Sequence, residues 1–338
     1  GTYDTEIRSR NLGQEDFITN LRTGLTYARP GRAFDFSVSA GVDIQRYLDY
    51  DEFDDENLFF DLSLNPQTEV RTSRFSVSGN LILDSRTYSD EEIGDIITTR
   101  TYGASLGVLY DPNRHYNLRA NASLNREDPD SERYFEEDRF TTGLTLEVPF
   151  KEEAFLEFGG TYARTESDRP QAAADSDIYT AFAGASGQLS PKLDGFLRAG
   201  IQSRETSRLG DDTSPYLSAG LSWLLDESSS IDLNASRELG STLNDRASET
   251  TRVTVTARRQ LNSRLSGNLG LEYLEDDLDA LGPGGRSDEE MGAFAGISYD
   301  LTRNTGLRLN VRYSDQSSDD PDFEFDRWRT SLTVNGRW

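Results

Sequence analysis

The last fourteen residues of the chain, Phe325–Trp338, read FDRWRTSLTVNGRW. One set of positions is mostly apolar or aromatic and comprises Phe325, Trp328, Thr330, Leu332, Val334 and Trp338. Between them stand Arg327, Arg329, Ser331, Thr333, Asn335 and Arg337. A period of two predicts a β-strand with one apolar and one polar face. Two interpretations are open for this segment: a half-buried strand of a soluble sandwich, or a strand of a membrane barrel.

The composition limits the choice of fold and partners. The chain has 338 residues, a formal net charge of -25, no cysteine and one histidine. No linker or shift in composition divides it, so we expect one domain over residues 1–338. No apolar run reaches the length of about 18 residues that a transmembrane helix needs. The acidity argues against a nucleic-acid partner, because such a partner requires a basic surface.

Turn-forming segments recur along the chain at intervals of about 35–43 residues. The short ones lie at residues 30–32, 66–73, 111–114, 151–153, 190–192, 226–229, 261–264 and 302–304. Longer acidic segments lie between them, at residues 51–56, 89–96, 127–136, 166–176, 205–213, 240–247, 275–289 and 315–324, with 11–15 as a shorter first member. This repeat predicts a series of β-hairpins.

Each interval between a short turn and an acidic segment holds a run that alternates apolar and polar side chains. Clear examples cover residues 34–45, 217–225 and 307–313, whereas residues 178–189 place apolar side chains on both faces. Runs of about 10–14 residues cross the hydrocarbon layer as tilted strands. Eight short turns imply sixteen strands. A leading strand over Thr2–Arg10 and the closing strand bring the number to about 18.

The predicted fold class is therefore all-β, a transmembrane antiparallel up-and-down β-barrel with short periplasmic turns and longer acidic extracellular loops. An even number of strands places both termini on the same side, which we expect to be the periplasm.

Aromatic residues gather where the predicted strands meet their turns, as in the two interfacial girdles of a membrane barrel. A soluble β-protein would not confine its core aromatics to strand ends. The residues that we predict at the membrane interfaces are Tyr27, Phe34, Tyr110, Tyr116, Phe150, Tyr216, Tyr273, Tyr299, Tyr313, Trp328 and Trp338.

Signals of enzymatic chemistry are nearly absent. His115 is the single histidine and lies in a short turn beside Arg114, where a rim residue is a better interpretation than a hydrolase base. The acidic segments could bind Ca²⁺ through oxygen ligands, but none matches an EF-hand loop. We therefore expect no enzyme, no catalytic residue, no metal site and no cofactor. We expect the acidic segments to form solvated loops that lie near lipopolysaccharide, whose molecules are bridged by divalent cations.

Arginines dominate the polar face of the predicted strands. Those assigned to the lumen as a path for anions are Arg22, Arg74, Arg119, Arg139, Arg198, Arg252, Arg258, Arg308, Arg312, Arg327 and Arg329. The same face carries Asp35, Asp43, Asp61, Glu147, Glu157, Asp232 and Glu272. Two interpretations stay open: arginine rings that select anions, or cross-strand ion pairs that stiffen the wall. No loop is long enough to resemble an inward-folded constriction loop.

The closing strand, which ends on the aromatic Trp338, resembles the last strand of bacterial outer-membrane β-barrels. The hairpin period and the acidic, Arg-rich, Lys-poor strands resemble porin-type barrels associated with exopolysaccharide export. That resemblance implies an outer-membrane conduit for an anionic polysaccharide or other polar solute. The alternatives are a general passive diffusion porin and a non-conducting barrel that anchors a surface complex. Expected partners are lipid, lipopolysaccharide and components of a secretion system.

Overall fold

The computed structural model describes residues 2–4, 15–31, 34–66, 74–90, 95–112, 115–130, 135–168, 175–206, 210–242, 246–279 and 285–336. Within these ranges the chain is almost entirely extended, and the helical segments are two single turns, η1 (Asp51–Phe53) and η2 (Pro321–Phe323). Among the described residues, no helix has the length and apolar character needed to cross a membrane.

Eighteen strands form one sheet. Their bounds are β1 (Thr2–Asp4), β2 (Asp16–Arg29), β3 (Phe34–Tyr47), β4 (Asp55–Pro66), β5 (Phe75–Asp90), β6 (Asp95–Tyr110), β7 (Asn117–Pro129), β8 (Glu137–Lys151), β9 (Ala154–Ser167), β10 (Ser176–Ser190), β11 (Leu193–Thr206), β12 (Gly210–Asp226), β13 (Ser229–Thr242), β14 (Arg246–Gln260), β15 (Leu265–Asp279), β16 (Arg286–Asp300), β17 (Thr305–Ser318) and β18 (Phe325–Gly336).

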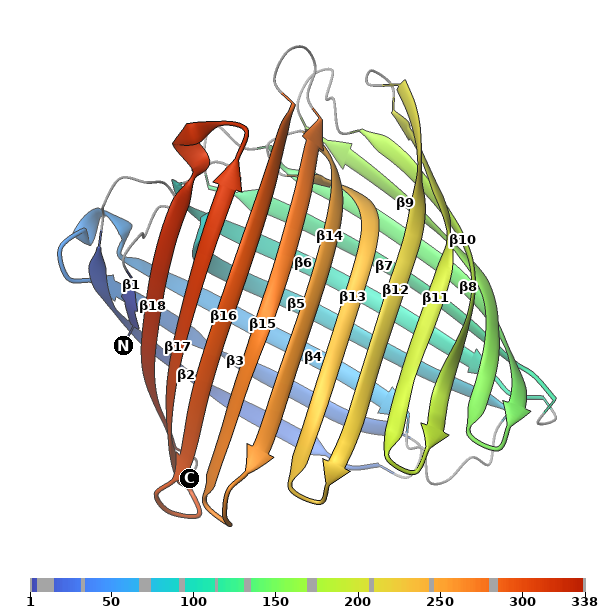
Figure 1. Ribbon diagram of the computed structural model, residues 1–338, viewed down its shortest axis with the longest axis horizontal. Helices are drawn as coiled ribbons and strands as arrows, with labels where there is room; N and C mark the ends of the chain where they lie inside the picture. Colours follow the sequence, from blue (N-terminus) through green and yellow to red (C-terminus); the bar gives the residue numbers. More distant parts are fainter. Residues whose placement is uncertain are drawn as a thin grey trace.

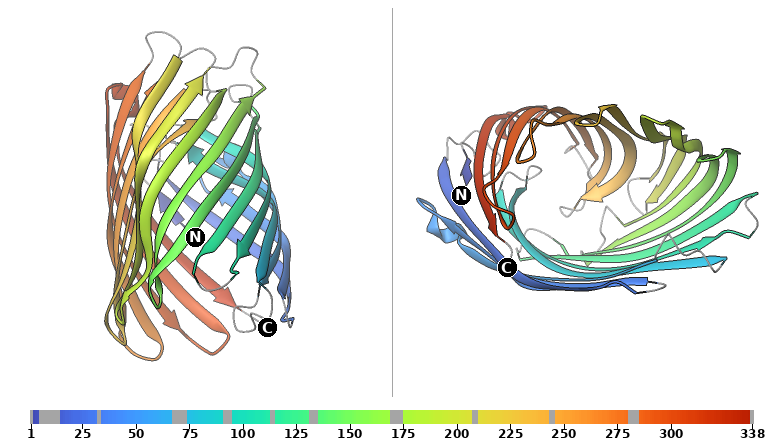
Figure 2. Two further views of the ribbon diagram at one scale, coloured as in Figure 1. Left: turned by 90° about the vertical axis from the view of Figure 1, so that its right-hand side faces the viewer. Right: turned by 90° about the horizontal axis from the view of Figure 1, so that it is seen from below.

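Every strand runs antiparallel to the next one along the chain. β1 pairs with β18 as well as with β2, and this closes the sheet into a barrel. Figure 1 shows the tilted strands of the wall, and Figure 2 shows a flattened ring in which the last, red strands lie beside the first, blue ones. The predicted all-β, antiparallel up-and-down barrel of about 18 strands is confirmed.

The sequence pattern predicted a first strand over Thr2–Arg10. The structure describes β1 over Thr2–Asp4, and residues 5–10 lie outside the described part of the chain. Asp4 pairs with Arg329 on one side and with Asp16, the first residue of β2, on the other. Thr2 pairs with Ser331, so β1 lies against the middle of β18 (Figure 1).

Alternation along the strands separates an apolar outer face from a polar inner face. On the outer face Leu25, Leu58 and Val334 are 83%, 67% and 66% exposed, respectively. Apolar surface of this extent does not face water in a soluble monomer, whereas a bilayer covers it. The inner faces of the same strands carry Arg22, Asn57 and Asn335, and the barrel interior is polar.

Two seams of the sheet lose their backbone ladder toward the acidic-segment end. The pairing of β4 with β5 stops at Phe59–Asp84, and the pairing of β12 with β13 stops at Leu217–Arg237. All four strands continue beyond these points. Because β12 follows β4 by eight strands in a ring of eighteen, the two interruptions lie on nearly opposite walls.

Candidate functional site in the lumen

Most of the arginines assigned to the lumen meet carboxylates of nearby strands on the inner face. Arg119 lies 2.9 Å from Glu147, and Arg198 lies 2.5 Å from Glu157, measured from Nε to the nearest carboxylate oxygen. Further pairs join Arg22 to Asp43 at 3.7 Å, Arg312 to Glu272 and Glu290 at 3.0 Å each, and Arg258 to Asp232. These contacts correspond to the cross-strand pairing that the sequence left open as one of two interpretations.

Arg327 and Arg329 lie on the inner face of β18 and hold the closing seam. The Asp4 carboxylate is fully buried and accepts hydrogen bonds from Arg327 Nη2 at 2.6 Å and Arg329 Nε at 2.9 Å. Arg327 is itself 5% exposed. Arg327 therefore stabilises closure of the barrel and is not available to solutes in the lumen.

Three arginines of the inner wall are not paired in this way. Within the part of the chain that the structure describes, Arg139, Arg252 and Arg308 have no carboxylate oxygen within 4.0 Å, the limit for a salt bridge. Arg308 Nε donates to Ser298 Oγ at 3.1 Å. Arg74 is exposed just before β5, at the short-turn end of the wall. The guanidinium groups of Arg139, Arg252 and Arg308 are thus local centres of positive charge.

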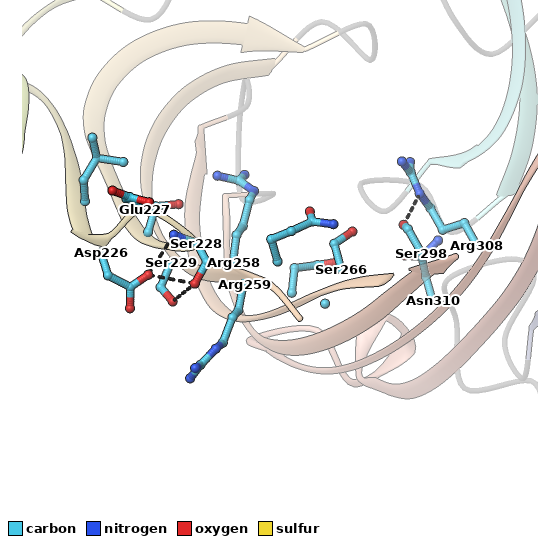
Figure 3. A pocket seen from close by; sticks show the side chains of 15 residues that line it. Asp226, Glu227, Ser228, Ser229, Arg258, Arg259, Ser266, Ser298, Arg308 and Asn310 are labelled. Atoms are coloured by element: carbon cyan, nitrogen blue, oxygen red, sulfur yellow. Dashed lines mark hydrogen bonds between the residues drawn. The ribbon is translucent and has the colours of Figure 1, made fainter. Parts of the chain in front are cut away.

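A recess of about 570 Å³ opens near the short turns that join β12 to β13 and β14 to β15. In Figure 3, Arg258 and Arg308 point to the same side of the wall, whereas Arg259 points to the opposite side. Alternation along β14 and β17 places Arg258 and Arg308 on the inner face.

Amide and hydroxyl groups fill the wall between these two arginines. The side-chain oxygens of Asn268 and Asn310 converge over Gly296, where a Cβ atom would stand 2.5 Å and 2.6 Å from them. We name the row Arg258, Asn268, Ser298, Arg308 and Asn310 the basic recess. Guanidinium forks bind carboxylate or phosphate, and amides and hydroxyls offer both donors and acceptors to a polyol.

A carboxylate borders the basic recess at the turn between β12 and β13. The hydroxyl and the backbone amide of Ser228 both donate to Asp226 Oδ1, each at 2.8 Å. These hydrogen bonds favour the charged form and lower the pKa of Asp226. The rim of the recess therefore keeps its negative charge in mildly acidic solution.

The end of the β13–β14 hairpin lies inside the barrel. Leu239 is 3% exposed and packs with Ala163 of β9 and Ile178 of β10. Ala163 and Ile178 belong to the inner faces of their strands, whereas Leu239 belongs to the outer face of β13. The outer face of the hairpin end therefore covers the inner faces of β9 and β10 (β13 and β14 bend at their upper ends in Figure 1).

Two buried side chains of β11 hold this segment, which we call the inward hairpin end (residues 238–242 and 246–250). Gln202 Oε1 accepts a hydrogen bond from the backbone N–H of Leu239 at 2.9 Å. Arg204 Nη1 donates to the carbonyl of Ser248 at 3.0 Å and to that of Gly240 at 3.3 Å. These bonds tie the backbone of the inward hairpin end to the inner face of β11.

Two features of the sequence are local signals of this inward segment. Ile178 and Phe182 place large apolar side chains on the polar face of β10, which is why the alternation there is mixed. Phe182 lies near Tyr216 of β12, with ring centroids 5.9 Å apart. Pro215 is a second signal, because a proline inside a strand indicates a ladder that lacks a partner.

Most of the predicted interface aromatics lie on the outer face near strand ends. Tyr27 is 60% exposed, Phe150 is 54% exposed, and Tyr313 packs on Trp328 with ring centroids 4.9 Å apart. Tyr110 stacks on Phe75 at 4.6 Å. Alternation also puts Tyr273 and Tyr299 on the outer face. Tyr116 directly precedes β7.

One interface prediction is wrong, and two fall outside what the structure describes. Tyr216 faces the lumen, because it occupies a polar-face position of β12, pairs with Gly200 of β11 and lies beside Phe182. Trp338 and the side chain of Phe34 lie outside the described residues. Phe325 at the start of β18 is buried on the inner face with Arg327, so it is not part of the outer apolar stripe.

Comparison with known proteins places these features in context. A family model described as "Putative beta-barrel porin 2" matches residues 153–337. Among solved structures, OccK2 (OpdF) of Pseudomonas aeruginosa in complex with glucuronate is similar, with a TM-score of 0.54, 14% identity, and coverage of 100% of this chain and 96% of that one. OpdK of P. aeruginosa with vanillate has a TM-score of 0.53, 11% identity, and coverage of 99% and 95%.

A larger transporter shares the same architecture. The FrpB iron transporter of Neisseria meningitidis in its apoprotein form has a TM-score of 0.55 and 11% identity, and the match covers 98% of this chain. The chain spans 65% of the length of that protein. At these identities the likeness concerns the fold alone. No curated protein matches the chain by sequence.

Proposed function

Because the chain belongs to this beta-barrel porin family, and is thus an outer-membrane channel, we propose that it conducts small anionic solutes along an arginine-lined inner wall. The single observation that carries the proposal is the basic recess. Its Arg258 and Arg308 point into the lumen, and the wall between them offers amide and hydroxyl groups instead of carboxylates.

The surrounding ion pairs support this proposal. A guanidinium paired to one carboxylate retains further N–H donors, and the side chain of Arg258 is 58% exposed despite its contact with Asp232. A passing carboxylate can exchange with Asp232 as the partner of Arg258, so each binding step stays weak. Conduction needs such weak, repeated binding.

The inward hairpin end favours small solutes over a polymer. The inward hairpin end occupies lumen space that a polysaccharide chain would have to share. The similar channels OccK2 and OpdK are in complex with glucuronate and with vanillate, both small carboxylates. We therefore favour sugar acids and related carboxylates, and export of an anionic exopolysaccharide is the second candidate because the basic recess also suits its repeating unit.

We also propose an orientation and a set of neighbours. The short turns, which lie at the same end of the barrel as the last residues of β18, would face the periplasm. The acidic segments would face the cell exterior beside lipopolysaccharide. Protease digestion of whole cells tests this orientation: cleavage within residues 275–289 without cleavage at residues 190–192 is expected, and the opposite pattern would reverse it.

Reversal potentials in a salt gradient test the proposed anion path. Purified barrel in a planar bilayer should prefer chloride over potassium, and the double variant Arg258→Gln/Arg308→Gln should shift the reversal potential toward that of a cation channel. Arg259→Gln is the matched control, because Arg259 neighbours Arg258 and points to the other side of the wall. An unchanged reversal potential in the double variant, or an equal shift in the control, would remove the proposal.

A further inference from the structure

Aromatic side chains gather on the inner face of β10, β11 and β12, although the inner wall of a channel is mostly polar. Phe182 of β10, Phe196 of β11 and Tyr216 of β12 occupy inner-face positions, and all three are partly exposed. We call these three residues the aromatic patch. Ring surface that faces water in the lumen gains free energy when a solute covers it.

The rings of Phe182 and Phe196 lie along the wall. A Cβ atom on Gly159 of β9 would stand 2.6 Å from Phe182 Cζ. Three ring atoms of Phe196 would stand 2.6, 3.1 and 3.2 Å from a Cβ atom on Gly220 of β12. Each ring therefore reaches over a glycine of a neighbouring strand, which leaves its other face toward the lumen.

A guanidinium group lies next to both of these rings. Arg198 Cζ is 5.0 Å from the ring centroid of Phe196 and 5.6 Å from that of Phe182, within the range of a cation–π contact. The ring of Tyr216 is 5.9 Å from that of Phe182. Four planar groups thus lie close together on the inner wall. Aromatic solutes stack on such groups in offset or edge-on arrangements.

The charge of Arg198 is balanced within the wall. Arg198 Nε lies 2.5 Å from Glu157 Oε2, and the other oxygen of Glu157 accepts a hydrogen bond from Ser186. The neighbouring pair of Arg119 and Glu147 is balanced in the same way. The aromatic patch therefore recognises a ring rather than a charge, and in this respect it differs from the basic recess.

The aromatic patch lies between the inward hairpin end and the basic recess. On the inner face of β10, Ile178 contacts the hairpin end and Phe182 follows four positions later. On β12, Gly220 lies beside the Phe196 ring, and Leu224 of the recess is four positions further, about 13 Å at 3.3 Å per residue. A solute that moves along this wall between the hairpin end and the recess passes over the patch.

We propose that the aromatic patch is a stacking site for aromatic carboxylates, whose rings cover Phe182, Phe196 and Tyr216 as they pass. The inference rests on the proposed function, because it takes the solute to be a carboxylate that uses the arginine-lined path. It adds a preference for planar, unsaturated rings, which the guanidinium and amide groups of the basic recess do not supply.

Block of the chloride current through the purified full chain in a planar bilayer tests the stacking site. Benzoate and cyclohexanecarboxylate are the probes, because both carry one carboxylate on a six-membered ring but only benzoate is planar and aromatic. Benzoate should halve the current at a concentration about five-fold lower, and the double variant Phe182→Leu/Tyr216→Leu should remove this difference. Tyr216→Phe keeps the ring and should retain the preference for benzoate.

Phe294→Leu is the matched control, because Phe294 also lies on the inner face and packs over Gly270, but it belongs to β16, four strands from Tyr216. A wild-type reversal potential would show that each variant is folded. Anion preference of the wild-type protein reports on the proposed function, whereas the ratio of the two blocking concentrations reports on the aromatic patch. Equal block by both acids in the wild-type protein, a benzoate preference that persists in the double variant, or its loss in Phe294→Leu would overturn the stacking site.

Discussion

At the scale of single residues, close packing on the inner wall decides which glycines can be replaced. A Cβ atom on Gly270 would stand 2.3 Å from the Phe294 ring and 2.6 Å from the carbonyl oxygen of Val255. Gly267, three residues earlier on the outer face, has its nearest such neighbour, the Gly296 carbonyl, at 3.6 Å. We predict that Gly270→Ala lowers the free energy of unfolding by about 1–3 kcal/mol through overpacking.

The matched variant Gly267→Ala should leave stability unchanged or raise it by about 0.5–1 kcal/mol, because alanine loses less conformational entropy in a strand. Urea unfolding in detergent micelles, followed by tryptophan fluorescence, measures both variants. Similar stabilities for the two would contradict the assignment of Gly270 to a crowded inner position.

Alternation predicted the face of most residues, but it did not predict their partners. Arg327 and Arg258 have the same pattern in the sequence, yet one is buried against Asp4 and the other is exposed in the basic recess. The difference arises from register between strands, and one strand's period of two carries no information about register. Tyr216 was misassigned although alternation along β12 places it on the polar face, opposite Gly200 of β11.

At the scale of elements, the inward hairpin end occupies space inside the barrel, where it packs on the inner faces of β9 and β10. Arg204→Met removes the hydrogen bonds from the guanidinium group to the Gly240 and Ser248 carbonyls, and hydrogen bonds from a charged donor contribute about 1.5–3 kcal/mol each. We predict that the segment then leaves the lumen, so that single-channel conductance rises and its current becomes noisier. Recordings in planar bilayers measure both quantities.

Arg164→Met is the control for this prediction, because Arg164 is exposed on the outer face of β9 and pairs with Glu166. The chain has no cysteine, so a Cys pair at Ile178 and Leu239 in the Arg204→Met background can be oxidised selectively. Oxidation should restore the smaller conductance. A conductance that stays at the wild-type level in Arg204→Met would show that the hairpin end does not limit the flow of ions.

The strands were predictable as elements, whereas the interrupted seams were not. Each strand carries its own alternation, so residues 217–225 were predicted as a strand, and the structure extends that strand to Gly210–Asp226, into the segment 205–213 that was predicted as a loop. Whether β13 stays paired with β12 depends on contacts that Gln202 and Arg204 of β11 make with the hairpin end at Leu239. These two parts of the chain are far apart in sequence and meet only in the folded barrel. Pro215 and the apolar Ile178 were the local signals of the interrupted ladder that we identified in the sequence.

At the scale of the whole molecule, the ring closes through β1. Within the described residues, β1 contributes three residue pairs to each neighbour, whereas β17 and β18 share twelve. The buried carboxylate of Asp4 forms ion pairs with Arg327 and Arg329 across this seam. The stability of the barrel should therefore respond sharply to changes at Asp4.

We predict that Asp4→Asn lowers the free energy of unfolding by about 3–5 kcal/mol, because it leaves the buried charge of Arg327 without its partner. Asp43→Asn is the control: its partner Arg22 is 3.7 Å away and half exposed, so a loss of about 0–1 kcal/mol is expected. Adding Arg327→Met to Asp4→Asn removes the unpaired charge and should recover part of the loss. Urea unfolding in lipid vesicles, followed by far-UV circular dichroism, measures all three variants. If Asp4→Asn and Asp43→Asn unfold at the same urea concentration, closure does not depend on the Asp4 contacts.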